Sequence, residues 1–355
     1  MRYIKNEHLK EGMVLGIPFY GLEFEVLKNA GEALCAKDLE ILDELGYAGA
    51  YVDDELSKGI EPRDIIPHDM RINAVRATCD FFVEAGLRAK NGGAPAKDTR
   101  EKQMSIIMPV IDALMKNQNR IIDVIDLKSF DYYKYYHAVN VAVVSLLIGI
   151  ESGLDRLQLY ELGTASLLHD VGNIFIPKSI LNKRGKLTKE EFEIIKSHSQ
   201  IGFEYLRENF DISIEACMGA LQHHERYNGT GYPGKLKRDE ISLYGRIIAI
   251  AEVYDALTSK RPFRSQSSLS FSMNYMDENS GLLFDPDVFE VFSGLVSKYP
   301  SGTCVVLDDG TRCIAAGNSP GDTAAPLLRK LEDADAAVDL RGKDGERTIT
   351  GIIDI

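Results

Sequence analysis

Apolar and polar positions follow three successive patterns along the chain, and these predict a helical middle between two small modules. Over residues 1–62 the apolar residues come in short runs typical of strands, at 13–17, 24–27 and 47–52. A single helical pattern interrupts them at residues 36–45. The sequence therefore predicts a small α/β module, ending at the Gly- and Pro-containing break of residues 59–62.

Helical periodicity dominates the middle of the chain. Two helices, over about 65–88 and 97–128, are expected to fill a linking segment at 63–128. In the second of them Ile121 and Ile122 continue the apolar register. These helices could pair with a second copy in a homodimer or pack on their own chain, and both readings stay open. Residues 129–298 are predicted to form an all-helical domain.

The pattern changes again after residue 299, where short β-like runs appear at 304–307, 314–316 and 348–353. Asp309 and Gly310 form a turn signal between the first two runs, which predicts a hairpin. The expected fold class is mainly α: an all-helical middle flanked by a small α/β module at 1–62 and a short β-rich segment at 299–355.

Composition narrows the class of protein. The 355 residues are 45% hydrophobic and 27% charged, as in soluble globular proteins. The net charge of -13 argues against a nucleic-acid polymer as partner, because such proteins neutralise phosphates with a basic surface. Five scattered cysteines without a CxxC pair indicate reduced thiols. The most apolar run, residues 138–150, is too short for a membrane span, so we expect a cytoplasmic protein without a membrane partner.

The histidines carry the candidate chemistry. Five of the seven lie between positions 137 and 224, and His169-Asp170 and His223-His224 are adjacent pairs. A lone histidine in an apolar helix is usually a core residue, but neighbours on a helix point about 100° apart and can address two metal ions. The candidate ligands are His137, His169, Asp170, His198, His223 and His224. With no cysteine among them, this set suits Fe, Mn, Co, Ni or Zn better than Mg or Ca.

The order and spacing of six motifs resemble a known family. The motifs are His137-Ala138-Val139-Asn140, His169-Asp170-Val171-Gly172, Ile176-Pro177-Lys178, His198-Ser199-Gln200-Ile201-Gly202, His223-His224-Glu225-Arg226-Tyr227-Asn228-Gly229-Thr230-Gly231-Tyr232-Pro233 and Asp255-Ala256-Leu257-Thr258. Together they resemble the HD-GYP family of the HD phosphohydrolase superfamily, whose members hydrolyse cyclic dinucleotides, chiefly cyclic di-GMP.

The resemblance implies that the candidate ligands hold two divalent metal ions, Fe or Mn first and Co, Ni or Zn as alternatives. Asp170 would bridge the ions and act as the catalytic residue. The last ligand of the family is an aspartate, and here Glu252 stands in its place. Asp255 would orient a histidine. Tyr133 occupies a position where some members have a glutamate for a third metal, so a binuclear centre is expected.

The resemblance also implies a set of substrate-binding residues, Asn173, Tyr232, Arg261 and Arg264. Asn173 departs from the family, whose motif has a lysine at this position. An asparagine offers a neutral hydrogen bond where lysine offers charge, and charge-assisted hydrogen bonds are about twice as strong. The two arginines could otherwise be a solvated helix end, but in so acidic a chain they suit an anionic ligand.

The resemblance thus implies a phosphodiesterase that opens cyclic di-GMP, or a related cyclic dinucleotide, to linear pGpG and then GMP through a hydroxide bridging two metals. The alternative is a cyclic-dinucleotide receptor that has lost turnover, which Asn173 and Glu252 favour. A different HD phosphohydrolase substrate, such as a nucleotide, is disfavoured by the Gly231-Tyr232-Pro233 string.

Overall fold

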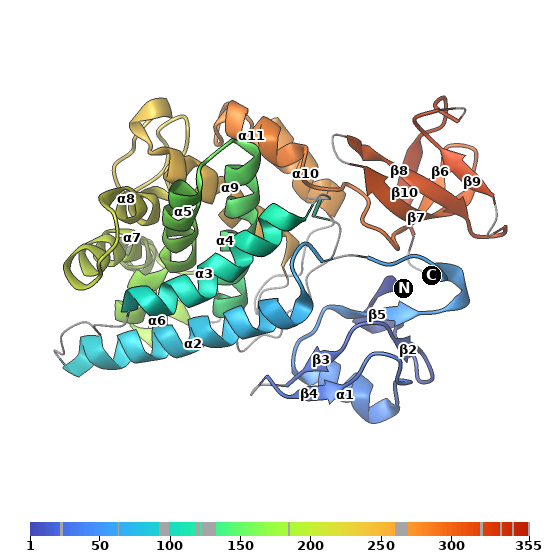
Figure 1. The fold of residues 1–355 in the computed structure, drawn as a ribbon, viewed down its shortest axis with the longest axis horizontal. Coiled ribbons are helices and arrows are strands. Elements are labelled where there is room, and N and C mark those ends of the chain that lie inside the picture. The colour runs from blue at the N-terminus through green and yellow to red at the C-terminus, as the bar shows by residue number, and fades with distance from the viewer. Residues whose placement is uncertain are drawn as a thin grey trace.

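A computed structural model gives the architecture of the chain (Figure 1). It describes residues 1–355 except 22–23, 63, 92–98, 118–120, 123–132, 184, 260–268, 320–321, 334–335, 343 and 354–355. Within this described part, the helices are too short or too polar to cross a membrane.

The N-terminal module combines a small sheet with one helix. Its antiparallel sheet has the order β1 (Arg2–Lys5), β5 (Gly49–Asp53), β2 (Val14–Leu15), and β3 (Phe19–Tyr20) pairs with β4 (Val26–Lys28). The predicted helix forms as α1 (Ala36–Glu44). Its first turn is closed by Asp38, whose Oδ2 accepts hydrogen bonds from the backbone N–H of Cys35 at 2.9 Å and from Nζ of Lys28 at 2.8 Å.

The middle of the chain is helical, as the periodicity predicts. The helices described there are α2 (His68–Asn91), α3 (Thr99–Lys116), α4 (Tyr133–Glu151), α5 (Arg156–Leu168), α6 (Lys178–Leu181), α7 (Lys189–Asn209), α8 (Ile214–Gln222), α9 (Leu243–Thr258), α10 (Leu269–Glu278) and α11 (Pro286–Ser293). Residues 135–149 of α4 are buried, because other helices pack around it. Lys134, near its start, is exposed. In Figure 1, α2 and α3 run along one side of this helical body.

The predicted second linking helix is too long at its C-terminal end. Helix α3 ends at Lys116, and Asn117 instead donates its side-chain amide to the carbonyl of Ile65 at 3.1 Å. Ile122 forms a β-bridge with Val296, which follows α11 along the chain. The apolar register of Ile121 and Ile122 therefore reflects burial in a tertiary contact, and the rest of the range to residue 128 lies outside the described residues.

The C-terminal segment is a five-stranded antiparallel sheet of order β10 (Ile349–Ile352), β6 (Cys304–Leu307), β7 (Arg312–Ser319), β8 (Asp322–Lys330), β9 (Ala337–Asp339). The predicted hairpin joins β6 to β7, with Gly310 at φ +82°. Strand β8 was not predicted from the sequence, because its alanines and Pro326 have little preference for strands. It pairs with β7 through two register shifts. The fold class predicted from the sequence is confirmed.

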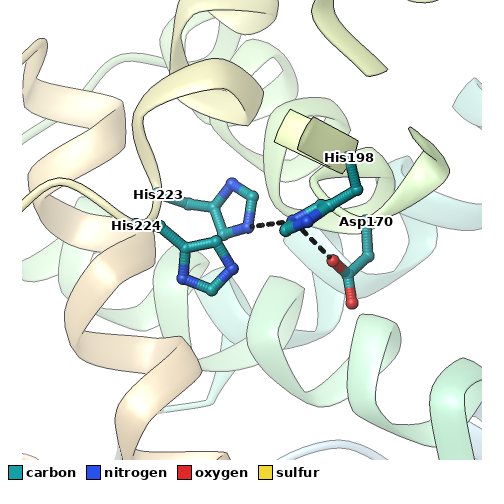
Figure 2. Close-up of side chains that lie close together, drawn as sticks. All are labelled: Asp170, His198, His223 and His224. Atoms are coloured by element: carbon teal, nitrogen blue, oxygen red, sulfur yellow. Dashed lines mark hydrogen bonds and ion pairs between the residues drawn. The ribbon is translucent and has the colours of Figure 1, made fainter. Parts of the chain in front are cut away.

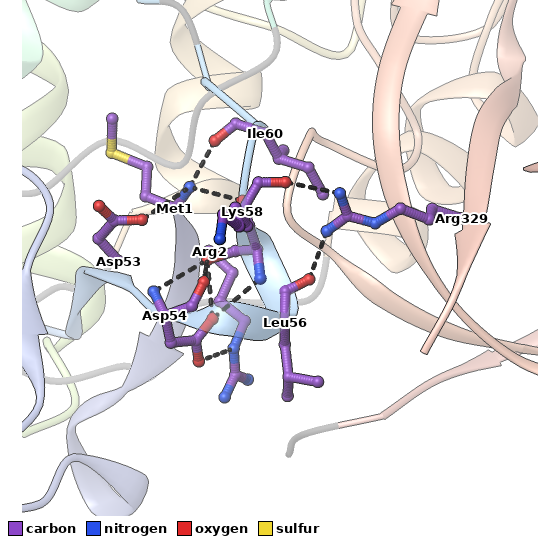
Figure 3. Close-up of polar contacts among 9 residues, drawn as sticks. Met1, Arg2, Asp53, Asp54, Leu56, Lys58, Ile60 and Arg329 are labelled. Atoms are coloured by element: carbon purple, nitrogen blue, oxygen red, sulfur yellow. Dashed lines mark hydrogen bonds and ion pairs between the residues drawn. The ribbon is translucent and has the colours of Figure 1, made fainter. Parts of the chain in front are cut away.

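The two flanking modules contact each other (Figure 3). Arg329 of β8 donates from Nη1 to the carbonyl of Lys58 at 2.6 Å and from Nη2 to that of Leu56 at 2.5 Å. Ile60 packs beside these bonds with Cys304 and Ile314 of the C-terminal sheet. The N- and C-terminal modules thus share a small core, while the segment boundaries at 62, 128 and 298 stay a prediction.

Candidate metal centre

The seven candidate ligands gather in two groups in the helical middle. In the first group, which we call the Asp170 group, Asp170, His198, His223 and His224 bring donor atoms within 4.8 Å of one another (Figure 2). The second, the His137 group, contains His137, His169 and Glu252 under the same limit. The groups adjoin, because the His169 ring lies 4.9 Å from that of His223 between centroids.

Helix ends and helix interiors position these side chains. His169 and His223 are the first residues after α5 and α8, and Asp170 follows directly. His198 lies within α7, His137 within α4 and Glu252 within α9.

Polar caps start the helices that carry the ligands. Asp155 accepts from the backbone N–H groups of Leu157 and Gln158 at 2.9 Å, which caps the start of α5. Thr188 caps α7 by accepting from the N–H of Glu191 at 3.2 Å. Such caps satisfy backbone donors that a helix start leaves open, so each helix begins at a defined residue.

Three of the histidines have the same orientation. In each, Nδ1 lies within hydrogen-bond distance of the carbonyl three residues earlier, at 2.6 Å for His169, 2.6 Å for His198 and 2.7 Å for His223. A carbonyl only accepts hydrogen bonds, so Nδ1 carries the proton in each ring. In the neutral form the lone pair is then on Nε2, which is the nitrogen aimed into the cluster.

This arrangement suits a metal ion. Nε2 of His198 lies 3.3 Å from Nε2 of His223 and 3.2 Å from Oδ1 of Asp170. Nε2 of His169 is buried and makes no hydrogen bond within the described part of the chain. Lone pairs that converge at this distance repel one another unless a proton or cation lies between them. Nitrogen and oxygen donors with Nδ1 held by a carbonyl are the usual surroundings of a divalent transition metal.

The His137 ring has a carboxylate on each side, that of Glu252 and that of Asp255. Nε2 of His137 lies 2.6 Å from Oε2 of Glu252, and Nδ1 donates to Oδ2 of Asp255 at 2.7 Å. Burial by itself lowers the pKa of His137, but the charge of Glu252 and the hydrogen bond to Asp255 outweigh it and raise the pKa to about 10. Glu252, despite its extra methylene, thus reaches the same centre as the histidines.

The two adjacent histidines of the Asp170 group, His223 and His224, both have lowered pKa values. Burial and the neighbouring His224 hold the pKa of His223 well below its usual value. Burial lowers the pKa of His224 to about 3, against the opposing charge of Glu252. Both rings are therefore neutral at pH 7, and neutral imidazole is the form that binds metals.

The predicted substrate residues are placed in part. Asn173 lies on a short 3-10 helix, η3 (Val171–Phe175), half-buried and three residues after Asp170. The Tyr232 ring lies 4.6 Å from that of His224 with an interplanar angle of 30°. Arg261 and Arg264 lie outside the described residues, as does the side chain of Tyr133.

Two cations beside the cluster were not singled out from the sequence. Lys196, two residues before His198, places Nζ 5.6 Å from the centroid of the Tyr232 ring. Arg226 is half-buried and donates to the carbonyl of Glu225 at 2.9 Å. Burial lowers the pKa of Arg226, and the negative charge of Glu252 opposes that shift, so the Arg226 guanidinium is within electrostatic reach of the candidate ligand Glu252. The sequence held one signal for each cation: Arg226 lies inside the motif that begins at His223, and Lys196 lies two residues before the motif that begins at His198.

A glycine allows the ligand-bearing elements to approach. A Cβ at Gly172 would lie 1.9 Å from the carbonyl oxygen of His198 and 2.8 Å from the backbone nitrogen of Gly202. Helix η3 therefore packs against α7 backbone to backbone. This contact brings Asp170, the residue directly before η3, close to His198 of α7.

The sequence is similar to an HD domain family and to proteins named as cyclic di-GMP phosphodiesterases. Residues 113–288 match the sequence model of a family described as the HD domain. The chain is 37% identical over 198 residues to the cyclic di-GMP phosphodiesterase PA4108 of Pseudomonas aeruginosa, which covers 56% of this chain and 48% of that protein. A cyclic di-GMP phosphodiesterase of Thermotoga maritima is 41% identical over 163 residues, 46% of this chain and 44% of that protein.

Other relatives carry a different substrate in their names. The 3'3'-cGAMP-specific phosphodiesterase 1 of Vibrio cholerae is 37% identical over 182 residues, 51% of this chain and 42% of that protein. Among solved structures, Bd1817, an HDG"Y"P protein of Bdellovibrio bacteriovorus, aligns with 82% of this chain and 97% of its own, at 16% identity and a TM-score of 0.44. The chain spans about half the length of the curated relatives it matches.

Proposed function

Because this chain belongs to the HD domain family, in its HD-GYP group, we propose that it is a metal-dependent phosphodiesterase of cyclic dinucleotides. The observation that carries the proposal is the pair of adjoining donor groups, in which histidine Nε2 atoms and carboxylate oxygens converge. Relatives named as cyclic di-GMP phosphodiesterases support cyclic di-GMP as the substrate. The proposed products are linear pGpG and then GMP.

The ligand assignment follows the two groups. The His137 group would hold one ion and the Asp170 group the other, with Fe or Mn as the first candidates. Asp170 suits a bridging role, because Oδ1 lies 3.2 Å from Nε2 of His198 and Oδ2 lies 3.7 Å from Nε2 of His169. When bound, two such ions neutralise a phosphate and lower the pKa of a water molecule.

Side chains beside the two donor groups would bind the base, the ribose and the phosphates of the substrate. The Tyr232 ring, beside His224, offers a face on which a base or ribose can pack. We assign phosphate contacts to Asn173, Arg261 and Arg264, and Lys196 adds a cation beside Tyr232. Without the family's lysine at position 173, the positive charge near the phosphate must come from such neighbours.

Turnover of cyclic dinucleotides tests the proposal. The protein, loaded separately with Mn²⁺, Fe²⁺, Co²⁺ or Ni²⁺ under reducing conditions, is incubated with cyclic di-GMP, 3'3'-cGAMP or cyclic di-AMP, and products are separated by chromatography. We expect linear products from cyclic di-GMP, lost in Asp170→Asn, which keeps the shape of the side chain. Metal and dinucleotide bound without any product would instead support the receptor, which the neutral Asn173 favours.

A further inference from the structure

A buried chain of hydrogen bonds leads into the metal centre from outside the HD domain. It starts at Arg71 of α2, whose Nε and Nη2 donate to the two oxygens of Asp64 at 2.9 and 2.6 Å. Nη1 of Arg71 donates to Oδ1 of Asn140 at 2.5 Å, and Nδ2 of Asn140 donates to Oδ1 of Asp255 at 3.1 Å. Oδ2 of Asp255 accepts from Nδ1 of His137 at 2.7 Å.

The members of this chain are shielded from water. Arg71 is 8% exposed, Asn140 6%, Asp255 4% and His137 4%. Buried hydrogen bonds between charged groups are short and directional, and a buried polar group left without its partner is costly. The contacts therefore hold one another in a single arrangement.

Arg71 fixes which atom donates and which accepts in each hydrogen bond of this series. A guanidinium only donates hydrogen bonds, so the side-chain oxygen of Asn140 must face it. The amide nitrogen of Asn140 then faces Asp255, whose second oxygen is left to accept from His137. With Nδ1 of His137 held in this way, Nε2 points toward Glu252 and the metal centre.

We propose that Arg71 is a positioning residue for the candidate metal ligand His137, acting through Asn140 and Asp255. Arg71 lies outside the segment that matches the HD domain, which begins at residue 113. The helix that follows the N-terminal module thus takes part in building the metal centre. The inference rests on His137 binding a metal, as in the proposed function, and it concerns metal affinity rather than turnover.

The test is a titration of the metal-free full chain with Co²⁺, followed by visible absorption, in the wild type and in Arg71→Met. Loss of an outer contact of a metal-bound histidine typically weakens metal affinity 10–100-fold. We expect one Co²⁺ to bind about tenfold or more weakly and the other, at the Asp170 group, to bind as before. Arg71→Lys restores a donor to Asn140 and should recover most of the affinity.

The matched control is Arg156→Met. Arg156 also pairs with an aspartate, Asp112, at 2.6 Å, but its side chain is 52% exposed and it begins α5, whereas His169 follows the other end of that helix. Both Co²⁺ ions should bind this variant as they bind the wild type. Melting curves of the metal-free proteins show whether each variant folds.

A second variant covers the case in which Arg71→Met does not fold. Asp64 is 22% exposed in its side chain, so Asp64→Asn should fold while loosening the outer end of the chain of bonds, with a smaller loss at the same ion. Unchanged Co²⁺ affinity in every folded variant would overturn the proposal. Two tightly bound ions without turnover in the wild type would instead contradict the proposed function and leave the positioning role standing.

Discussion

Nε2 of His198 lies 3.3 Å from Nε2 of His223, although Nδ1 of each ring is already engaged by a backbone carbonyl. Two lone pairs at this distance favour a cation between them. We therefore predict that Mn²⁺ raises the melting temperature of the metal-free protein. An ion present at 100 times its dissociation constant adds about 2.7 kcal/mol to the free energy of unfolding.

Differential scanning calorimetry with and without the ion measures this gain. The exposed His8 provides the control, because His8→Ala removes a histidine without touching the cluster and should keep the full shift. A melting temperature unmoved by Mn²⁺, Fe²⁺, Co²⁺ or Ni²⁺ would contradict a metal centre in this protein.

Glu252 replaces the aspartate of the family, and its carboxylate reaches both His137 and His169, at 2.6 and 3.4 Å. Glu252→Gln keeps the size of the side chain but removes its charge, so we expect the ion of the His137 group to be lost. Glu252→Asp restores the family residue and should retain two ions. Metal analysis after gel filtration counts the ions, and two ions in Glu252→Gln would show that Glu252 is not a ligand.

Asn173→Lys should strengthen substrate binding, because it restores a cation near the expected phosphate. A charge-assisted hydrogen bond in place of a neutral one is worth on the order of 1.4 kcal/mol, which is about a tenfold lower KM for cyclic di-GMP. Ser179→Lys adds the same charge at a nearby exposed position and should leave KM unchanged. Equal effects of both lysines would mean that only overall charge matters.

Gly172→Ala should destabilise the fold strongly, because its Cβ would lie 1.9 Å from the carbonyl oxygen of His198. Backbone atoms cannot move aside as a side-chain tip can, so we expect a loss of about 3 kcal/mol or more in the free energy of unfolding. Gly86→Ala, in α2 with nothing within 4 Å, should instead gain about 0.5–1 kcal/mol. Urea unfolding of both variants measures the difference.

Asp38→Asn should weaken the N-terminal module in a pH-dependent way. Burial acts to raise the pKa of Asp38, but the hydrogen bonds from Lys28 and from the backbone of Cys35 prevail and lower it. A carboxylate with a lowered pKa stabilises the folded state above its unfolded value of about 3.9, and this contribution is lost as the pH falls through the folded value. We expect Asp38→Asn to cost about 1 kcal/mol at pH 7 and little at pH 3.

Unfolding curves at the two pH values, followed by circular dichroism, would show this pattern. Glu40→Gln, an exposed position on the same helix, is the control and should change stability little at either pH. A cost of the same size at pH 3 and pH 7 would assign the effect of Asp38→Asn to packing rather than to charge.

Local signals in the sequence predicted local structure well. The 3.6-residue repeat found the helix at Ala36–Glu44, and the Asp309-Gly310 turn found the first C-terminal hairpin. Strand β8 was missed, because it is stabilised by pairing with its neighbours rather than by strand-forming residues. The helix predicted over 97–128 was too long for a similar reason. Ile122 fits the helical repeat, but in the structure it forms a bridge with Val296, 174 positions away.

Sequence motifs predicted the candidate ligands, but they did not predict the contacts that hold those ligands in place. The order of histidines and the resemblance to a family gave a ligand set, and the structure brings those residues together. The contact between Arg71 and Asn140 joins residues 69 positions apart, and no periodicity or motif marks it. Long-range polar contacts leave no trace in a single sequence, so only the fold can reveal them.

The ends of α5 and α8 have a consequence for the order of binding. His169 and His223 follow the last residues of these helices, so both helices direct their carbonyl ends toward the cluster. The C-terminal end of a helix carries about half a negative charge. This field, added to Asp170 and Glu252, attracts cations and repels a dinucleotide. We therefore expect metal ions to load first and to reverse the local potential, after which the anionic substrate can enter.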